Sequence, residues 1–236
     1  MANAITRHIP NTITCLNLFS GCAACVMAFE ANYVWAAFFI LLSSVFDFLD
    51  GLIARLLKAY SPLGKELDSL ADVVSFGVAP ALMVFSLYKE VYYPQFLAGM
   101  AAYVPYVAFL IAVFSALRLA KFNIDERQTG SFIGLPVPAH ALFWASLIVG
   151  SHSFLTSPHF NAVYLALPVV LFSGLLVSEI PMFALKFKNL SWAGNKTAFI
   201  FILTCIPLLV FLRVSGLAAC IVWYILLSLF TKGKNH

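Results

Sequence analysis

Charged side chains are scarce in this chain of 236 residues, in which Asp, Glu, Lys and Arg together make up 10% and hydrophobic residues 62%. A soluble domain carries about a quarter charged residues, so this composition excludes an ordinary water-soluble fold and predicts a polytopic membrane protein. The sequence also lacks internal repeats, low-complexity segments and any polar stretch long enough for a separate soluble domain. We therefore expect a single compact bundle.

Clusters of cysteine or histidine are lacking as well. The five cysteines are scattered, and the one close pair, Cys22 and Cys25, lies in an apolar run where small residues usually serve close helix packing. Redox chemistry is the alternative interpretation of this C-x-x-C pair. No zinc site is expected, because the following histidines are isolated in the sequence: His140, His152 and His159. The N-terminal residues lack a basic region followed by a cleavage motif, so no removable signal is expected.

Long apolar runs recur along the whole chain. A run of about 20 apolar residues is long enough to cross a bilayer as a helix. Eight candidate spans can be placed, at residues 12–29, 33–57, 67–88, 97–120, 136–156, 160–181, 197–212 and 215–230. The pattern predicts an all-α fold, a polytopic membrane helix bundle of about eight transmembrane helices, with both termini on the same side.

The basic residues provide a test of this number of spans. If the N-terminus is cytoplasmic, only Lys89 and Arg213 fall on the outer side. The cytoplasmic side then collects Arg7, Arg55, Lys58, Lys65, Arg118, Lys121, Arg127, Lys186, Lys188, Lys196, Lys232 and Lys234. Such a bias follows the positive-inside rule, so we expect an integral cell-membrane protein with both termini cytoplasmic. The net charge of +4 marks this cytoplasmic rim and does not indicate nucleic-acid binding.

Four aspartates interrupt two of these apolar runs. Asp47 and Asp50 are three residues apart, and Asp68 and Asp72 are four apart, so each pair shares one helix face. The two helices are joined by the short turn KAYSPLG, at residues 58–64, and are therefore antiparallel neighbours. We expect the four carboxylates to converge just below the cytoplasmic surface of the membrane.

Converging carboxylates in an apolar environment need compensating charge, because they repel one another and are costly to desolvate. All-oxygen ligands favour Mg²⁺ or Mn²⁺, and two such ions can clamp a phosphate and activate an attacking hydroxyl. Gly51 and Gly64 would let a ligand approach the backbone, and Arg55 can donate two hydrogen bonds to a phosphate. A structural ion-pair cluster with Arg55, Lys58 and Lys65 is one alternative, and a divalent-cation transporter is another.

The spacing of these residues resembles a known family. The order Asp47-x-x-Asp50-Gly51-x-x-Ala54-Arg55, then eight residues, then Gly64-x-x-x-Asp68-x-x-x-Asp72 matches the CDP-alcohol phosphatidyltransferase motif at every position. Members of this family are integral-membrane enzymes that transfer a phosphatidyl group from a CDP-linked lipid to an alcohol and release CMP. Five further stretches resemble the branch of this family that uses serine. They are IPNTITCLNLFSG (9–21), DSLADVVSFGVAPA (68–81), RLAKFN (118–123), FIGLPVPAHA (132–141) and LLVSEIPMFALK (175–186).

The resemblance implies a role for each matched position. Two Mg²⁺ or Mn²⁺ ions would be held by Asp47, Asp50, Asp68 and Asp72, and Asp72 would also be the catalytic base. The CDP-lipid would be bound by Asn11, Thr14, Gly51, Arg55, Ser61 and Gly64. Asn11 and Thr14 have a structural alternative, which is capping of the first helix next to Pro10. The resemblance further implies CDP-diacylglycerol and L-serine as substrates and a homodimer in the bilayer.

The acceptor is defined less closely, because the motif concerns the CDP end of the reaction. The carboxylate of serine needs a cation, and Arg118 and Lys121, with Asn123 beside them, are the candidates. Membrane anchoring is the alternative role for the two basic residues, and an enzyme that uses glycerol phosphate or inositol phosphate remains open. Glu179, next to Pro181, is interpreted either as a substrate contact or as a packing residue. We expect the phosphatidyltransferase membrane domain at 1–187 and a C-terminal transmembrane helix pair, packed on the same bundle, at 188–236.

Overall fold

The structure is a computed structural model that describes residues 4–125, 132–183 and 192–231. The predicted boundary between residues 187 and 188 lies outside the described residues. The same is true of several residues assigned to the cytoplasmic side: Arg127, Lys186, Lys188, Lys232 and Lys234.

Regular structure in the described ranges is almost entirely helical, which confirms the all-α prediction. The helices are α1 (Ala4–Phe29), α2 (Tyr33–Leu56), α3 (Pro62–Asp72), α4 (Ala79–Leu87), α5 (Leu110–Ile124), α6 (Val137–Leu155), α7 (Ala162–Val177), α8 (Trp192–Leu212) and α9 (Ser215–Thr231). A π-helical turn, Val73–Val78, joins α3 to α4, and two 3-10 segments, Gln95–Met100 and Val104–Phe109, precede α5. The two short strands β1 (Phe132–Ile133) and β2 (Pro181–Met182) pair antiparallel.

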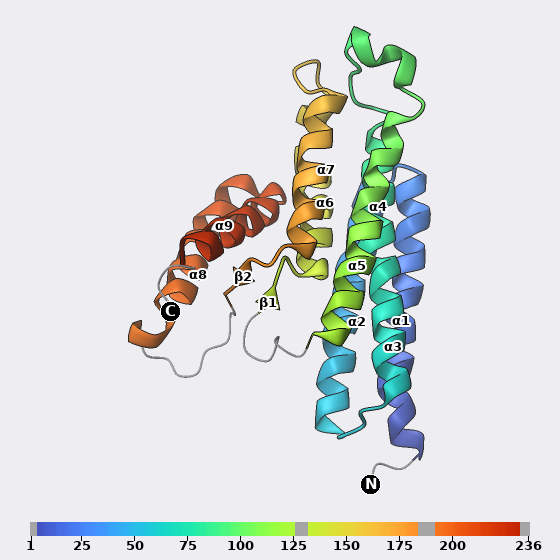
Figure 1. Cartoon of the computed structure of the whole chain (residues 1–236), viewed down its shortest axis with the longest axis vertical. Coiled ribbons are helices and arrows are strands. Elements are labelled where there is room, and N and C mark those ends of the chain that lie inside the picture. Colours follow the sequence, from blue (N-terminus) through green and yellow to red (C-terminus); the bar gives the residue numbers. More distant parts are fainter. Residues whose placement is uncertain (1–3, 126–131, 184–191, 232–236) are drawn as a thin grey trace.

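Helices α1 to α5 stand side by side as an upright bundle, with α6 and α7 along one side (Figure 1). Helices α8 and α9 form an oblique hairpin that packs on the bundle through contacts between α9 and α6. Many large apolar side chains on the outer faces of these helices are exposed, among them Phe19, Phe48, Leu171 and Phe211. Such surfaces are expected where helices face lipid hydrocarbon.

Five helical segments among the described residues are long and apolar enough to cross a membrane: His8–Phe29, Tyr33–Leu56, Pro62–Leu87, Val104–Ile124 and Asn195–Leu212. Helices α7 and α9 are apolar but shorter. Helix α6 coincides with the predicted span at 136–156, although non-helical backbone angles interrupt it at Ser151. The chain is therefore an integral membrane protein with several spans.

Two predicted span boundaries are wrong. The fourth span was expected from residue 97, but the apolar helical segment begins at Val104. Gly99 and the flanking prolines Pro94 and Pro105 disfavour a regular α-helix there, and the chain forms 3-10 turns instead. The sixth span was expected to reach residue 181, but α7 ends at Val177, because the following residues form β2.

Two capping motifs shape the turn between α2 and α3. Lys58 adopts left-handed angles (φ 51°), and the amide of Ala59 donates to the carbonyl of Ala54 at 2.9 Å, which closes α2 as a Schellman motif. Ser61 then caps α3, since its hydroxyl accepts a hydrogen bond from the amide of Gly64 at 3.0 Å. This compact turn holds the aspartate-bearing faces of the two helices at the same level.

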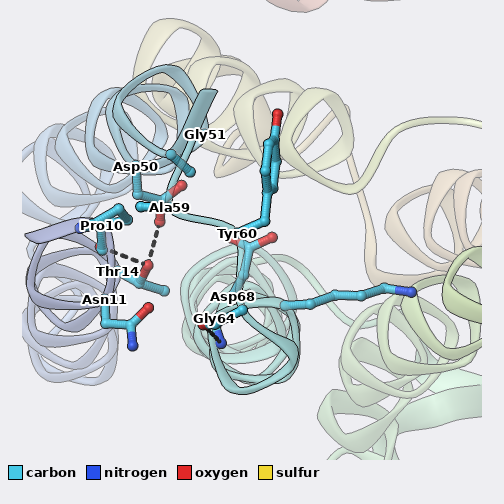
Figure 2. Close-up of a pocket in the computed structure, with 12 residues that line it drawn as sticks. Pro10, Asn11, Thr14, Asp50, Gly51, Ala59, Tyr60, Gly64 and Asp68 are labelled. Atoms are coloured by element: carbon cyan, nitrogen blue, oxygen red, sulfur yellow. Dashed lines mark hydrogen bonds between the residues drawn. The ribbon is translucent and has the colours of Figure 1, made fainter. Parts of the chain in front are cut away.

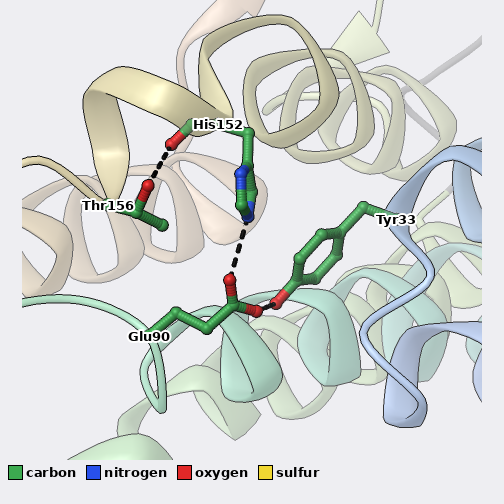
Figure 3. A network of polar contacts seen from close by, with 4 residues as sticks. All are labelled: Tyr33, Glu90, His152 and Thr156. Carbon is green, nitrogen blue, oxygen red and sulfur yellow. Dashed lines mark hydrogen bonds and ion pairs between the residues drawn. The ribbon is translucent and has the colours of Figure 1, made fainter.

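A polar contact joins three helices at the opposite end of the bundle (Figure 3). The hydroxyl of Tyr33, at the start of α2, donates to the carboxylate of Glu90, which follows α4. The second oxygen of Glu90 lies 3.0 Å from Nε2 of His152 on α6. His152 is isolated in the sequence, and its acidic partner comes from a distant part of the chain. We refer to Tyr33, Glu90 and His152 as the Glu90 clasp.

Candidate active site

Three of the four aspartates meet where α2 and α3 face each other. Carboxylate oxygens of Asp47, Asp50 and Asp68 all lie within 4.8 Å of one another. Asp50 is buried, whereas Asp47 and Asp68 are partly buried. Asp72 follows one turn further along α3, is buried, and lies outside this group of three. The expected convergence of acids from two helices is thus present, with Asp72 set apart from the other three.

Helix α1 supplies hydrogen bonds to two of the aspartates. The hydroxyl of Thr14 donates to Oδ2 of Asp50 at 2.6 Å, as Figure 2 shows. The amide nitrogen of Asn17 donates to Oδ1 of Asp72 at 3.2 Å. The sequence interpretation included Thr14 but missed Asn17. A signal was present, because Asn11, Thr14 and Asn17 recur every three residues and form a polar row along α1.

The donor set of this cluster is suited to a hard metal ion. Each of the three residues offers carboxylate oxygens, which are the ligands that Mg²⁺ and Mn²⁺ prefer. Oδ1 of Asp68 is buried and has no hydrogen-bond partner in the described part of the chain, so it retains a free lone pair for a ligand. The group formed by Asp47, Asp50 and Asp68 could therefore hold a metal ion.

A cavity of about 220 Å³ opens beside the cluster, between α1, α2 and the start of α3 (Figure 2). It is lined by Pro10, Asn11, Thr14, Asp50, Gly51, Ala54, Ala59, Tyr60, Ser61, Gly64, Lys65 and Asp68. Most positions expected to contact the CDP-lipid are in this wall. Arg55 is not, but its guanidinium lies next to Gly51, 3.6 Å from where a Cβ on that glycine would stand.

The cavity wall depends on the absence of a side chain at Gly64. A Cβ on this residue would lie 2.9 Å from Oδ1 of Asn11 and 3.0 Å from Oγ of Ser61, closer than side chains tolerate. Two further residues line the wall: Tyr60, which the sequence interpretation missed, and Lys65, which it considered only for a structural ion-pair cluster. Tyr60 is 70% exposed at the rim, where an aromatic ring can stack on a nucleobase.

The three residues expected to bind the acceptor lie in the C-terminal half of α5, and each has a different environment. Asn123 donates to the hydroxyl of Ser69 at 2.8 Å, so its side chain ties α5 to α3. Lys121 forms an ion pair with Glu179 at 3.6 Å. The structure thus places Glu179 beside an expected acceptor residue.

Arg118 differs from both neighbours because it is buried. Its guanidinium lies 4.7 Å from the ring centroid of Phe122 and interacts electrostatically with Asp72. Among the described residues, no carboxylate lies within ion-pair distance of Arg118. A buried cation without a paired anion is costly, and an anionic ligand would remove that cost.

Comparison with known proteins decides the family. The family model described as CDP-alcohol phosphatidyltransferase matches residues 7–174, which run from the first turns of α1 into the last turn of α7 and include all four aspartates. The chain belongs to the CDP-alcohol phosphatidyltransferase family.

Several curated relatives of this phosphatidyltransferase match over most of their length. The CDP-diacylglycerol–serine O-phosphatidyltransferase of Helicobacter pylori is 36% identical over 208 residues, covering 86% of this chain and 81% of the relative. The enzyme of the same name from Bacillus subtilis is 34% identical over 174 residues, covering 74% and 89%. The archaetidylserine synthase of Methanothermobacter thermautotrophicus is 30% identical over 192 residues, covering 80% and 73%.

Proposed function

We propose that this phosphatidyltransferase transfers the phosphatidyl group of CDP-diacylglycerol to the hydroxyl of L-serine and releases CMP. The observation that carries the proposal is the buried aspartate group beside a cavity whose wall contains the matched positions of the family motif. Serine as acceptor is supported by the relatives, since two are named for transfer to serine and a third as an archaetidylserine synthase.

The acidic residues are proposed to hold two Mg²⁺ or Mn²⁺ ions, with Asp47, Asp50 and Asp68 as ligands and Asp72 as an additional ligand. When bound, the ions supply positive charge that offsets the negative charge of the pyrophosphate. Thr14 orients the carboxylate of Asp50 through its hydrogen bond. This hydrogen bond supports metal ligands that are already oriented before the substrate binds.

The cavity is proposed to receive the cytidine and the pyrophosphate. Asn11 and Thr14 present short polar groups from α1, while Gly51 and Gly64 leave the space that the phosphates need. Ser61 lies in the same wall. Arg55, exposed at the end of α2, is placed to donate to a phosphate oxygen at the mouth. The acyl chains would leave the site sideways into the bilayer.

Asp72 is proposed as the general base. It accepts the proton of the serine hydroxyl as the serine oxygen bonds to the phosphorus that carries diacylglycerol. The bond from this phosphorus to the bridging oxygen breaks, and that oxygen leaves with CMP. Arg118 is proposed to bind the carboxylate of serine, because it is the buried cation beside Asp72. Lys121 and Asn123, also on α5, would be further contacts of the serine acceptor.

The membrane arrangement is also a proposal. Eight transmembrane helices with both termini and the active site cytoplasmic agree with the distribution of basic residues. Helices α8 and α9 would form a C-terminal pair outside the catalytic unit, since the family match ends at residue 174. The enzyme is proposed to work as a homodimer, which molar-mass measurement of the detergent-solubilised protein would test.

The decisive experiment uses purified protein, CDP-diacylglycerol, Mn²⁺ or Mg²⁺ and a panel of alcohols, with CMP release as readout. We expect release with L-serine that stops when the metal is chelated. Release with glycerol phosphate or inositol phosphate and not with serine would reassign the acceptor. Absence of CMP with every alcohol would remove the enzyme proposal and leave a divalent-cation transporter to be tested by ion uptake.

A further inference from the structure

Asn17 of α1 forms hydrogen bonds to both helices that carry the aspartates. Its side chain is fully buried, and its amide nitrogen donates to Oδ1 of Asp72 on α3. Its backbone carbonyl accepts two hydroxyl hydrogen bonds, from Ser43 on α2 at 3.2 Å and from Ser75 in the π-helical turn at 3.1 Å. Three segments are thus joined at a single residue.

The close approach of Ser75 depends on Gly21, which lies one helical turn beyond Asn17. A Cβ on Gly21 would stand 2.2 Å from Oγ and 2.8 Å from Cα of Ser75, so only glycine leaves room for this contact. The π-helical turn begins directly after Asp72, and such turns are frequently found at functional sites. Asn17 therefore holds this part of the chain at two points, at Asp72 through its side chain and at Ser75, inside the turn, through its backbone carbonyl.

A packing role alone does not account for an asparagine here. Oδ1 of Asn17 is buried and has no hydrogen-bond partner among the described residues, which is a cost that an apolar side chain would avoid. The contact that the amide does make is with Asp72, whose carboxylate can only accept when ionised. The amide is therefore suited to fix the direction of this carboxylate.

We infer that Asn17 is a positioning residue for the general base: it holds the carboxylate of Asp72 in the orientation that accepts the proton of the acceptor hydroxyl. The inference rests on the proposed function, in which Asp72 is that base. Asn17 acts through Asp72, so its loss should reduce turnover without weakening the binding of the nucleotide.

The test compares Asn17→Leu, which keeps the branched shape and removes the amide, with Ser20→Ala as a matched control. Ser20 is buried on the same helix and donates to the carbonyl of Phe39 at 3.0 Å, away from the aspartates. For Asn17→Leu we expect kcat to fall on the order of 10- to 100-fold, as for other residues that orient an active-site ligand. KM for CDP-diacylglycerol and the Kd of CDP with Mn²⁺ should stay unchanged, and Ser20→Ala should keep wild-type kcat.

Unchanged kcat in Asn17→Leu would overturn the inference, as would a loss of CDP affinity in proportion to the loss of kcat. If Asn17→Leu does not fold, the double variant Ser43→Ala/Ser75→Ala takes its place, because it keeps the amide and frees the backbone. This variant should lower kcat at constant KM, and wild-type kcat would count against the inference. A wild-type protein that is inactive with every alcohol would overturn the proposed function, and this inference with it.

Discussion

At the scale of single residues, burial distinguishes side chains that otherwise look alike. Asp72 is buried and hydrogen-bonded by Asn17, whereas Asp68 is partly buried and one of its oxygens has no hydrogen-bond partner among the described residues. Arg118 is buried and Lys121 is ion-paired with Glu179, although both are basic residues one turn apart on α5. The two aspartates therefore have different proposed roles, and so do the two basic residues.

Asp72→Asn tests the division among the aspartates. The amide keeps the shape of the side chain but cannot accept the proton, so turnover should fall by about 10²- to 10⁴-fold. The Kd of CDP with Mn²⁺ should be largely retained, which titration calorimetry would measure. Glu66→Gln is the control, because Glu66 is an exposed acid on the same helix. Wild-type turnover in Asp72→Asn would remove Asp72 as the base.

Arg118→Gln tests recognition of the acceptor. If the guanidinium binds the serine carboxylate, KM for L-serine should rise about 10- to 100-fold, since a hydrogen bond to a charged group contributes about 1.5–3 kcal/mol. The activity with ethanolamine, which has no carboxylate, should not fall in the same variant. Steady-state CMP release with both alcohols measures this. An equal loss with the two acceptors would contradict carboxylate binding by Arg118.

At the scale of the helices, the site depends on how closely neighbouring segments approach. The Schellman motif at Lys58 and the cap at Ser61 bring α2 directly into α3, so the two acidic faces meet. Gly21 lets α1 touch the π-helical turn behind Asp72. The site is therefore defined by α1, α2 and α3 together, and α5 adds Arg118, the proposed contact of the acceptor.

Gly21→Ala tests the contact between α1 and the π-helical turn. The added methyl group overlaps Ser75, so the helices must separate, at a cost of about 1–3 kcal/mol in stability. Thermal unfolding in detergent should show a lower midpoint, and kcat should fall as well. Gly174→Ala on α7 is the matched control, because nothing lies within 4 Å of its Cβ position. Equal midpoints for the two variants would show that the close contact is unimportant.

At the scale of the whole molecule, the two ends of the bundle have different tasks. One end contains the aspartates, the cavity and Arg118, and the other contains the Glu90 clasp (Figure 3). The clasp ties α2 and α6 to the end of α4, far along these helices from the acidic group. Stability and chemistry should therefore be separable by substitution.

Glu90→Gln tests this separation. Loss of the carboxylate weakens the contacts to Tyr33 and His152, and stability should fall by about 1 kcal/mol. The thermal midpoint should be lower than that of Tyr103→Phe, a change at an exposed tyrosine between the two 3-10 segments. kcat should match the wild type, because the clasp does not touch the site. Reduced kcat at temperatures where the variant is folded would contradict this.

Sidedness can be measured with single cysteines in a cysteine-free variant. We expect a membrane-impermeant maleimide to label Tyr103→Cys in intact cells, since residue 103 is at the end away from the site. Lys58→Cys, in the turn between α2 and α3, should react only after the cells are permeabilised. The reverse pattern would contradict a cytoplasmic active site.

The sequence by itself determined the membrane class, the helical fold and the acidic motif. Composition, apolar run length and residue spacing are local properties, and a chain that must satisfy its backbone in lipid has few other folds available. Spacing of three and four residues was enough to predict that aspartates from two helices meet. Local signals also explain the two errors in the span boundaries. The apolar run begins at residue 97, before the helical segment, and the other run continues to residue 181, past the end of α7.

Only the tertiary structure decided which distant residues complete the site. Asn17 reaches Asp72 across 55 positions of sequence, and its backbone is held by Ser43 and Ser75 from two other segments. The burial of Arg118 and the pairing of Lys121 with Glu179 likewise depend on how α5 packs against its neighbours. Spacing within one helix predicts which face a residue occupies. The partner on that face depends on the packing between helices.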